Sequence, residues 1–233
     1  MNINLVNIFF KLKFILRRNI HDQMPQKLIF SNNDVIDKNA YLNWRTKDGE
    51  DIQNLLALAD GFMKSAIELS KICIEDNLQK QADILIFTIL ANVNHGIELY
   101  LKSTLWTLNK LLKNGRKIEG RHNIKQIFQT VKARAKDLKG DKYLKSYACE
   151  NINLNEYIDE LFSLITIDEN NKDQMDFSRY SMTTEYKNHF YIESLENVIV
   201  DLENFALRFT EIHKKLKDIS EELYFIELKE IHK

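Results

Sequence analysis

The hydrophobic positions of this chain repeat with the period of an α-helix along most of its length. In 51–77 apolar residues recur every three or four positions, and in about 80–113 they cover most sides of the predicted helix. The first pattern is typical of a helix with one buried face, whereas a helix that is apolar on most sides must be covered by other elements. We therefore predict two long helices, of which the second is central to the fold.

The segment KNGRKIEGRHN ends the central helix, with Gly115 and Gly120 as the residues that interrupt it. Asn123 or His122 then lies near the N-cap of a further helix, whose apolar positions continue to Leu138. A short polar side chain in this place accepts a hydrogen bond from a free backbone N–H of the first turn. The pattern therefore predicts a third helix that starts at 122 or 123.

Two more helices are predicted in the C-terminal half. One covers about 154–166, and the other is the clearest in the chain because its apolar positions keep helical spacing from Leu195 to Ile226. Between 173 and 191 the helical pattern breaks, which predicts extended chain or a small hairpin before the last helix.

The composition favours one all-α domain. The 233 residues include a single proline, Pro25, and six scattered glycines, too few to form the turns of a β-sandwich or to mark a linker. We predict an all-α domain in 49–233, preceded by an N-terminal extension or docking arm in 1–48.

The overall charge and the cysteines exclude several classes of protein. With 33 Lys and Arg against 34 Asp and Glu, the chain has no field that would attract nucleic acid over a long range. Cys73 and Cys149 form no C-x-x-C pair, so they are interpreted as buried thiols in a reducing, cytoplasmic environment rather than as zinc ligands or a disulfide. Phosphate-loop, dinucleotide and zinc-protease motifs are absent from the sequence, and no metal or cofactor is predicted.

The N-terminal residues MNINLVNIFFKLKFILRRN are apolar, with basic residues at Lys11, Lys13, Arg17 and Arg18. The charges lie within or after the apolar run, unlike those of a secretory signal, and no uncharged run reaches the roughly 20 residues that cross a bilayer. We expect a docked amphipathic helix or, as the alternative, a helix that binds a partner or a membrane surface, without stable membrane insertion.

A polar stripe on the central helix is the first candidate site. His95, Glu98 and Lys102 fall within one sector of the helix, interleaved with apolar positions. Either they form a buried ion-pair network that fixes helix packing, or they line a pocket for a ligand or a phosphate. Metal binding by His95 and Glu98 lacks a second pair of ligands.

Basic residues elsewhere could reach this stripe. His122 follows Arg121 at a helix start, where backbone N–H groups favour an anion, although a capping role is the simpler interpretation. Arg179 and Tyr180 precede the last helix and could both contact the carboxylate of Glu98, unless Arg179 is an ordinary surface residue.

The last helix contains the spacing R-x4-H, with Arg208 and His213. RNA cleavage without a metal needs a base for the 2′-hydroxyl proton and a cation for the phosphate, which these two residues could supply. Five helical steps place them roughly 140° apart, so one helix cannot easily direct both at one phosphate. A homodimer could bring two copies together; the alternative is two solvated residues beside an apolar stripe.

Three segments in order, ANVNHGIELYLKSTLW, GRHNIKQIF and DFSRYSMT, precede the long terminal helix. Together they resemble a branch of the prokaryotic HEPN-like helical domains, whose central helix has the form H-x-I-E-L-x-L-K, followed by G-H-[DN]-L and F-R-Y. The resemblance covers about Leu55 to Leu216. It implies a bundle of four or five helices, frequently dimeric, in phage defence, toxin–antitoxin systems or RNA metabolism.

Many HEPN proteins with an R-x4-6-H motif are metal-independent endoribonucleases, which would make Arg208 and His213 catalytic. Here Phe209 replaces the polar residue that commonly follows the arginine. The sequence therefore predicts a defence or stress-response protein that binds RNA or a nucleotide phosphate and could cleave RNA. The alternative is a non-catalytic module that binds a protein encoded nearby.

Overall fold

The computed structural model describes residues 27–43, 45–116, 118, 122–165, 175–183, 185–193 and 196–229. The chain divides into two compact units, Met1–Leu42 and Asn43–Lys233; the boundary predicted from the sequence, after residue 48, lies slightly further along. In the described part of the first unit the one helical element is the 3-10 turn η1 (Ile36–Lys38). The predicted N-terminal amphipathic helix lies outside the described residues.

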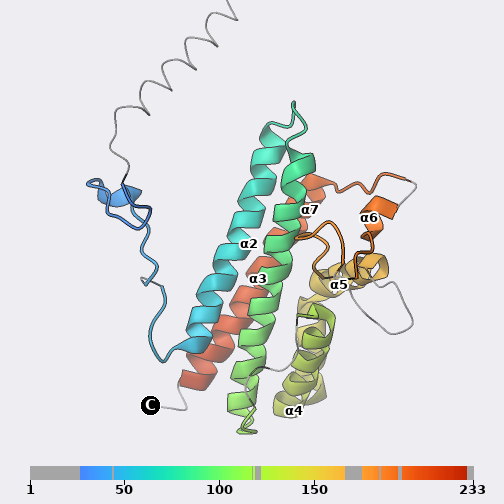
Figure 1. Ribbon diagram of the computed structural model, residues 1–233. Helices are drawn as coiled ribbons and strands as arrows, with labels where there is room; N and C mark the ends of the chain where they lie inside the picture. Colours follow the sequence, from blue (N-terminus) through green and yellow to red (C-terminus); the bar gives the residue numbers. More distant parts are fainter. Residues whose placement is uncertain are drawn as a thin grey trace, which may run out of the picture. The chain divides into compact units, whose positions relative to one another are not determined.

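The second unit is built on two long helices, α2 (Asp51–Glu75) and α3 (Ala82–Leu111), which confirm the first two predicted helices. They run side by side in opposite directions, and α7 (Leu202–Glu221) contacts both (Figure 1). The two helices pack tightly at Gly96, where an added Cβ atom would lie 2.7 Å from Met63 Cγ and 3.2 Å from Met63 N. Glycine is therefore favoured at this position because a side chain would displace Met63.

The central position predicted for the second helix is confirmed, since α3 contacts α2, α4 and α7. Its buried residues include polar ones, such as Thr104, whose Oγ1 lies 2.8 Å from Ser220 Oγ on α7. By length and composition α3 could also span a membrane, a test that the core helices of soluble proteins pass as well. Half of its most apolar stretch is buried within the fold.

The helix α4 (Ile124–Glu150) begins where the sequence predicts, because Asn123 Oδ1 accepts a hydrogen bond of 2.9 Å from Gln126 N. It continues beyond the predicted end through a kink at Gly140, whose φ of 80° is accessible mainly to glycine. After the kink comes Cys149, which is exposed; the prediction of a buried thiol is correct only for Cys73.

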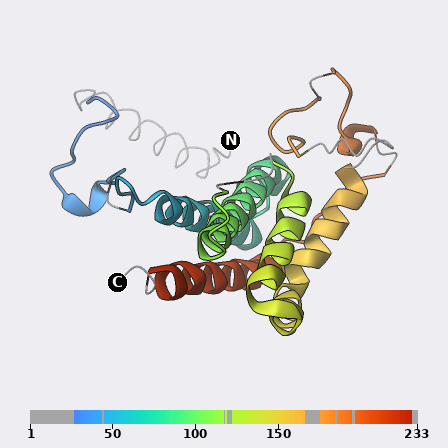
Figure 2. The same ribbon diagram turned by 90° about the horizontal axis from the view of Figure 1, so that it is seen from below.

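The helix α5 (Ile152–Ile165) follows α4 directly and contacts α4 and α7, as Figure 2 shows from below. Its apolar face is buried, which agrees with the helix predicted at about 154–166. In the described part of 173–191 there are turns, one isolated antiparallel bridge between Met182 and Asn188, and the short helix α6 (Phe190–Glu193).

The last helix starts later than its apolar spacing predicts. Asp201 Oδ1 accepts hydrogen bonds from the backbone N–H groups of Glu203 and Asn204, at 3.0 and 3.1 Å, and so fixes the N-cap of α7. The predicted helical course through Val198 is wrong, because this residue lies outside any helix and lines a cavity. At its C-terminal end α7 continues into a π-helical stretch, η2 (Glu222–Leu228). The described residues form an all-α fold.

Candidate functional site

The buried carboxylate of Glu98 on α3 lies close to three basic side chains. Lys102 Nζ lies 2.7 Å and His122 Nδ1 lies 3.0 Å from Glu98 Oε1, and His95 Nδ1 lies 3.8 Å from Glu98 Oε2. His95 and Lys102 are one helical turn away on either side, as the predicted stripe requires, whereas His122 comes from the turn before α4. We call these four residues the Glu98 cluster.

The charge of Glu98 is stabilised by its neighbours. Only 9% of its side chain is exposed, and burial alone would raise the pKa of this carboxyl. The side chains of His95 and Lys102, with the charge of His122, outweigh burial and lower the pKa to about 2. Glu98 is therefore ionised at neutral pH, and Lys102 compensates its charge at close range.

A cavity of about 160 Å³ opens beside the cluster, which we call the Glu98 cavity. Helices α2 and α3, the turn before α4 and the segment 175–179 all contribute to its wall. The lining residues are Phe62, Ala91, Asn92, Asn94, His95, Glu98, His122, Met175, Ser178 and Arg179. The structure therefore brings His95, Glu98, His122 and Arg179 to one place.

Arg179 lines this cavity without making the ion pair with Glu98 that the sequence suggests. Among the described residues its guanidinium has no hydrogen-bond or ion-pair partner; only its backbone N–H is bonded, to Asp176 O. Tyr180 is 63% exposed and is not among the residues that line the cavity. The predicted contact of Tyr180 with Glu98 is not made. Arg121 lies outside the described residues.

Sequence reasoning missed the asparagines of the cavity wall. Asn94 is 5% exposed; its Oδ1 accepts a hydrogen bond of 2.6 Å from Tyr157 OH, and its Nδ2 has no partner among the described residues. Asn92 Nδ2 donates to Ser65 Oγ at 3.1 Å. The signal was present, since Asn94 lies one helical turn before Glu98 and therefore on the same face.

The two residues predicted to cleave RNA point to different neighbours. Arg208 Nη2 lies 3.0 Å from Glu156 Oε2, and Arg208 Nη1 lies 3.8 Å from Glu160 Oε2, both on α5. His213 Nε2 lies 2.9 Å from Asp60 Oδ1 on α2. Within one chain the two side chains do not converge on a common site, as their angular separation on the helix predicts.

Asp60 forms a second polar cluster, which the sequence did not reveal. Besides His213, its Oδ1 lies 3.3 Å from Lys217 Nζ, its Oδ2 lies 2.7 Å from Lys64 Nζ, and Tyr100 OH is 3.5 Å away. Burial lowers the pKa of His213, which the nearby Asp60 only partly offsets. A neutral imidazole whose Nε2–H donates to Asp60 therefore links α7 to α2.

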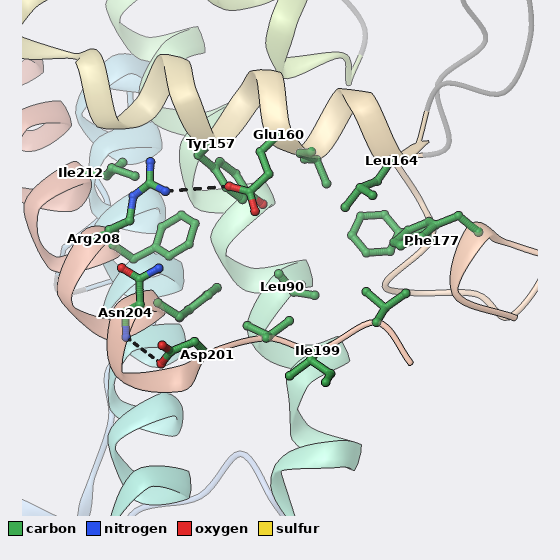
Figure 3. Close-up of a pocket in the computed structure, with 16 residues that line it drawn as sticks. Leu90, Tyr157, Glu160, Leu164, Phe177, Ile199, Asp201, Asn204, Arg208 and Ile212 are labelled. Carbon is green, nitrogen blue, oxygen red and sulfur yellow. Dashed lines mark hydrogen bonds and ion pairs between the residues drawn. The ribbon is translucent and has the colours of Figure 1, made fainter. Parts of the chain in front are cut away.

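A larger cavity, of about 310 Å³, lies between α5, α7 and the chain before α7 (Figure 3). Its wall is mainly aromatic and aliphatic, with Tyr157, Phe177, Phe190, Phe205 and Phe209 among its residues. In Figure 3 Arg208 is already joined to Glu160 at one side. An arginine that is neutralised in this way offers little attraction to a further anion.

The chemistry available at the Glu98 cavity is that of hydrogen bonding and charge. In the part of the chain that the structure describes, no group of three or more His, Cys, Asp or Glu residues is placed to hold a metal ion. No protein-family model, no curated protein and no solved structure matches this chain.

Proposed function

We propose that this chain is a HEPN-like helical protein of prokaryotic defence or stress response, which binds RNA or a nucleotide through a phosphate group at the Glu98 cavity. The observation that carries this proposal is the guanidinium of Arg179, which has no protein partner among the described residues and lies in the same cavity wall as His122. A guanidinium at the wall of a cavity suits a phosphate, because it is positively charged and can donate two parallel hydrogen bonds to phosphate oxygens.

The balance of charges supports an anionic ligand despite the carboxylate. Lys102 lies 2.7 Å from Glu98 and compensates its charge, so that Arg179 contributes an excess positive charge. His122 uses Nδ1 toward Glu98 while 70% of its side chain is exposed, which leaves Nε2 at the open side of the cavity. The ring presents Nε2 as a second nitrogen for a bound phosphate.

The size of the cavity limits what enters it. About 160 Å³ is below the roughly 300 Å³ at which pockets begin to enclose a drug-sized molecule. A phosphate or one part of a sugar fits this space, and the remainder of a nucleotide or RNA strand would lie across the surface outside.

The geometry favours binding without cleavage. A general base must lie within hydrogen-bond reach of the reacting group, and His213 is instead bonded to Asp60 while Arg208 is paired with α5. We accordingly propose a non-catalytic member of a defence or toxin–antitoxin complex, acting as a homodimer or with a protein encoded nearby. RNA cleavage would need a second copy to complete the site.

The test is the affinity of the purified protein for a fluorescently labelled single-stranded RNA. Replacing Arg179 by alanine removes the unpaired cation and is expected to weaken binding about tenfold or more, since a hydrogen bond between charged groups contributes about 1.5–3 kcal/mol. Lys187→Ala is the matched control, because it removes an exposed cation of the same segment that is paired with Glu185 outside the cavity. No RNA binding, or equal losses in the two variants, contradicts the proposal.

A further inference from the structure

Two polar atoms on one face of α3 have no hydrogen bond to any described residue at the Glu98 cavity. Asn94 Nδ2 is a buried donor without a partner in the part of the chain that the structure describes. Glu98 Oε2 is an acceptor whose nearest basic atom, His95 Nδ1, lies 3.8 Å away, too far for a hydrogen bond. Buried polar groups are nearly always paired, so the buried Nδ2 indicates a ligand that accepts a hydrogen bond, and Glu98 Oε2 offers that ligand an acceptor of its own.

The surrounding contacts keep these two atoms available. Tyr157 OH, from α5, holds Asn94 Oδ1 at 2.6 Å, so the amide presents its Nδ2 on the other side. Lys102 and His122 both bind Glu98 Oε1, which leaves Oε2 as the oxygen with spare capacity. Asn94 lines the cavity together with Glu98.

A phosphate alone does not match this pair of atoms. Its oxygens accept hydrogen bonds, as Asn94 Nδ2 requires, but they would be repelled by the ionised Glu98. A hydroxyl group suits both, because it accepts from Nδ2 and donates to Oε2. Asn94 and Glu98 lie one helical turn apart on the same face of α3 and both line the cavity, so their side chains are neighbours there.

We infer that Asn94 and Glu98 together bind a ribose hydroxyl, so that the cavity selects ribonucleotides over deoxyribonucleotides. This inference rests on the proposed function, because Arg179 and His122 would hold the adjoining phosphate at the outer side of the same cavity. The 2′-hydroxyl is the group by which a protein distinguishes RNA from DNA at a given position. The ligand is thus a ribose phosphate, supplied either by an RNA strand or by a free nucleotide.

The experiment compares each ribose ligand with its deoxy counterpart by equilibrium titration of the full chain. One arm uses single-stranded RNA and DNA of the same sequence, and the other uses adenosine monophosphate and 2′-deoxyadenosine monophosphate. We expect the ribose form to bind about tenfold more tightly, the difference that one hydrogen-bonded hydroxyl makes. The arm in which the preference is found identifies the source of the ligand.

Two substitutions of Asn94 test whether the preference for ribose over deoxyribose depends on this residue. Asn94→Ala removes the donor, and Asn94→Asp keeps the acceptor for Tyr157 while replacing Nδ2 by an oxygen. In both, the ratio of ribose to deoxyribose affinity is expected to fall to about one, whatever happens to the affinities themselves. Arg179→Ala is expected to weaken both ligands and to preserve the ratio. Circular dichroism confirms that each variant is folded.

The experiment distinguishes failure of the hydroxyl site from failure of the proposed phosphate binding. Equal affinity of the wild type for ribose and deoxyribose ligands overturns the hydroxyl site and leaves the proposed phosphate binding in place. A preference that persists in both Asn94 variants also overturns it. Absence of binding by every ligand overturns both this inference and the proposed function.

Discussion

His122 Nδ1 lies 3.0 Å from Glu98 Oε1, although the two residues are 24 positions apart in the sequence. The contact joins the turn before α4 to the middle of α3, so it exists only when these two helices are packed together. Because Lys102 binds the same oxygen, a single buried carboxylate organises one side of the cavity. Changes at Glu98 should therefore affect stability and ligand binding together.

Replacing Glu98 by glutamine keeps the shape of the side chain but removes its charge. Its pKa, lowered from 4.5 to about 2, means that the folded state favours the ionised form. Allowing for solvent screening, we expect a loss of roughly 2 kcal/mol in the free energy of unfolding at neutral pH. The wild-type advantage is complete above the unfolded pKa near 4.5 and disappears as the pH falls toward about 2. Urea unfolding at a series of pH values measures it.

The control for this substitution is Glu68→Gln on α2. Glu68 is 65% exposed and paired only with Lys71, so its loss should change stability by less than about 0.5 kcal/mol. A Glu98→Gln difference that is absent, or that stays constant as the pH falls, would show that the carboxylate charge does not stabilise the fold.

The crossing of α2 and α3 can be tested at two glycines. Gly96→Ala places a Cβ 2.7 Å from Met63 Cγ and 3.2 Å from Met63 N, and should cost about 1–3 kcal/mol by overpacking. Gly61→Ala meets nothing within 4 Å and should stabilise its helix by up to about 1 kcal/mol. Thermal unfolding followed by circular dichroism distinguishes them; equal effects at both positions would argue against a tight crossing.

The Asp60–His213 contact predicts how the stability of the fold changes when the pH is lowered. Burial lowers the pKa of His213 below its usual 6.5 against the opposing effect of Asp60, so the unfolded chain binds the proton first as the pH falls. Stability should decrease when the pH is lowered through 6.5, and this step should vanish in His213→Gln. The groups facing the imidazole are Asp60, Tyr100, Lys64 and Lys217. Melting temperatures that instead rise on acidification would indicate a charged pair.

Total RNA incubated with the protein in EDTA should remain intact. Arg208→Ala should leave RNA binding unchanged and reduce stability by about 0.5–1 kcal/mol, because it removes a partly exposed ion pair with Glu156. Gel electrophoresis of the RNA and urea unfolding give the two readouts. Cleavage that persists in EDTA and is lost in both Arg208→Ala and His213→Gln would establish the catalytic role that the geometry disfavours.

The helical framework could be predicted because burial of one face leaves a period in the sequence. The bounds of α2 and α3 differ from the predicted 51–77 and 80–113 by no more than two residues at either end. The start of α7 could not be found in this way, since Val198 keeps helical spacing while it lines a cavity. Only the cap at Asp201 marks the true beginning.

The candidate site was predictable where its residues share a helix and less so where they meet across the fold. His95, Glu98 and Lys102 follow from helical spacing alone. The partners of Asp60 and Asn94 are His213 and Tyr157, which are 153 and 63 positions away, and no local pattern connects them. Such contacts depend on how the helices are rotated against one another.

The most direct test of phosphate binding at the Glu98 cavity is an NMR titration that follows the histidine ring signals, assigned by single substitutions. Addition of single-stranded RNA should shift the signals of His95 and His122 in a saturable way while the signal of His213 stays in place, and in Arg179→Ala the same shifts should need about tenfold more RNA. Saturable RNA binding that leaves the signals of His95 and His122 unchanged would contradict the account.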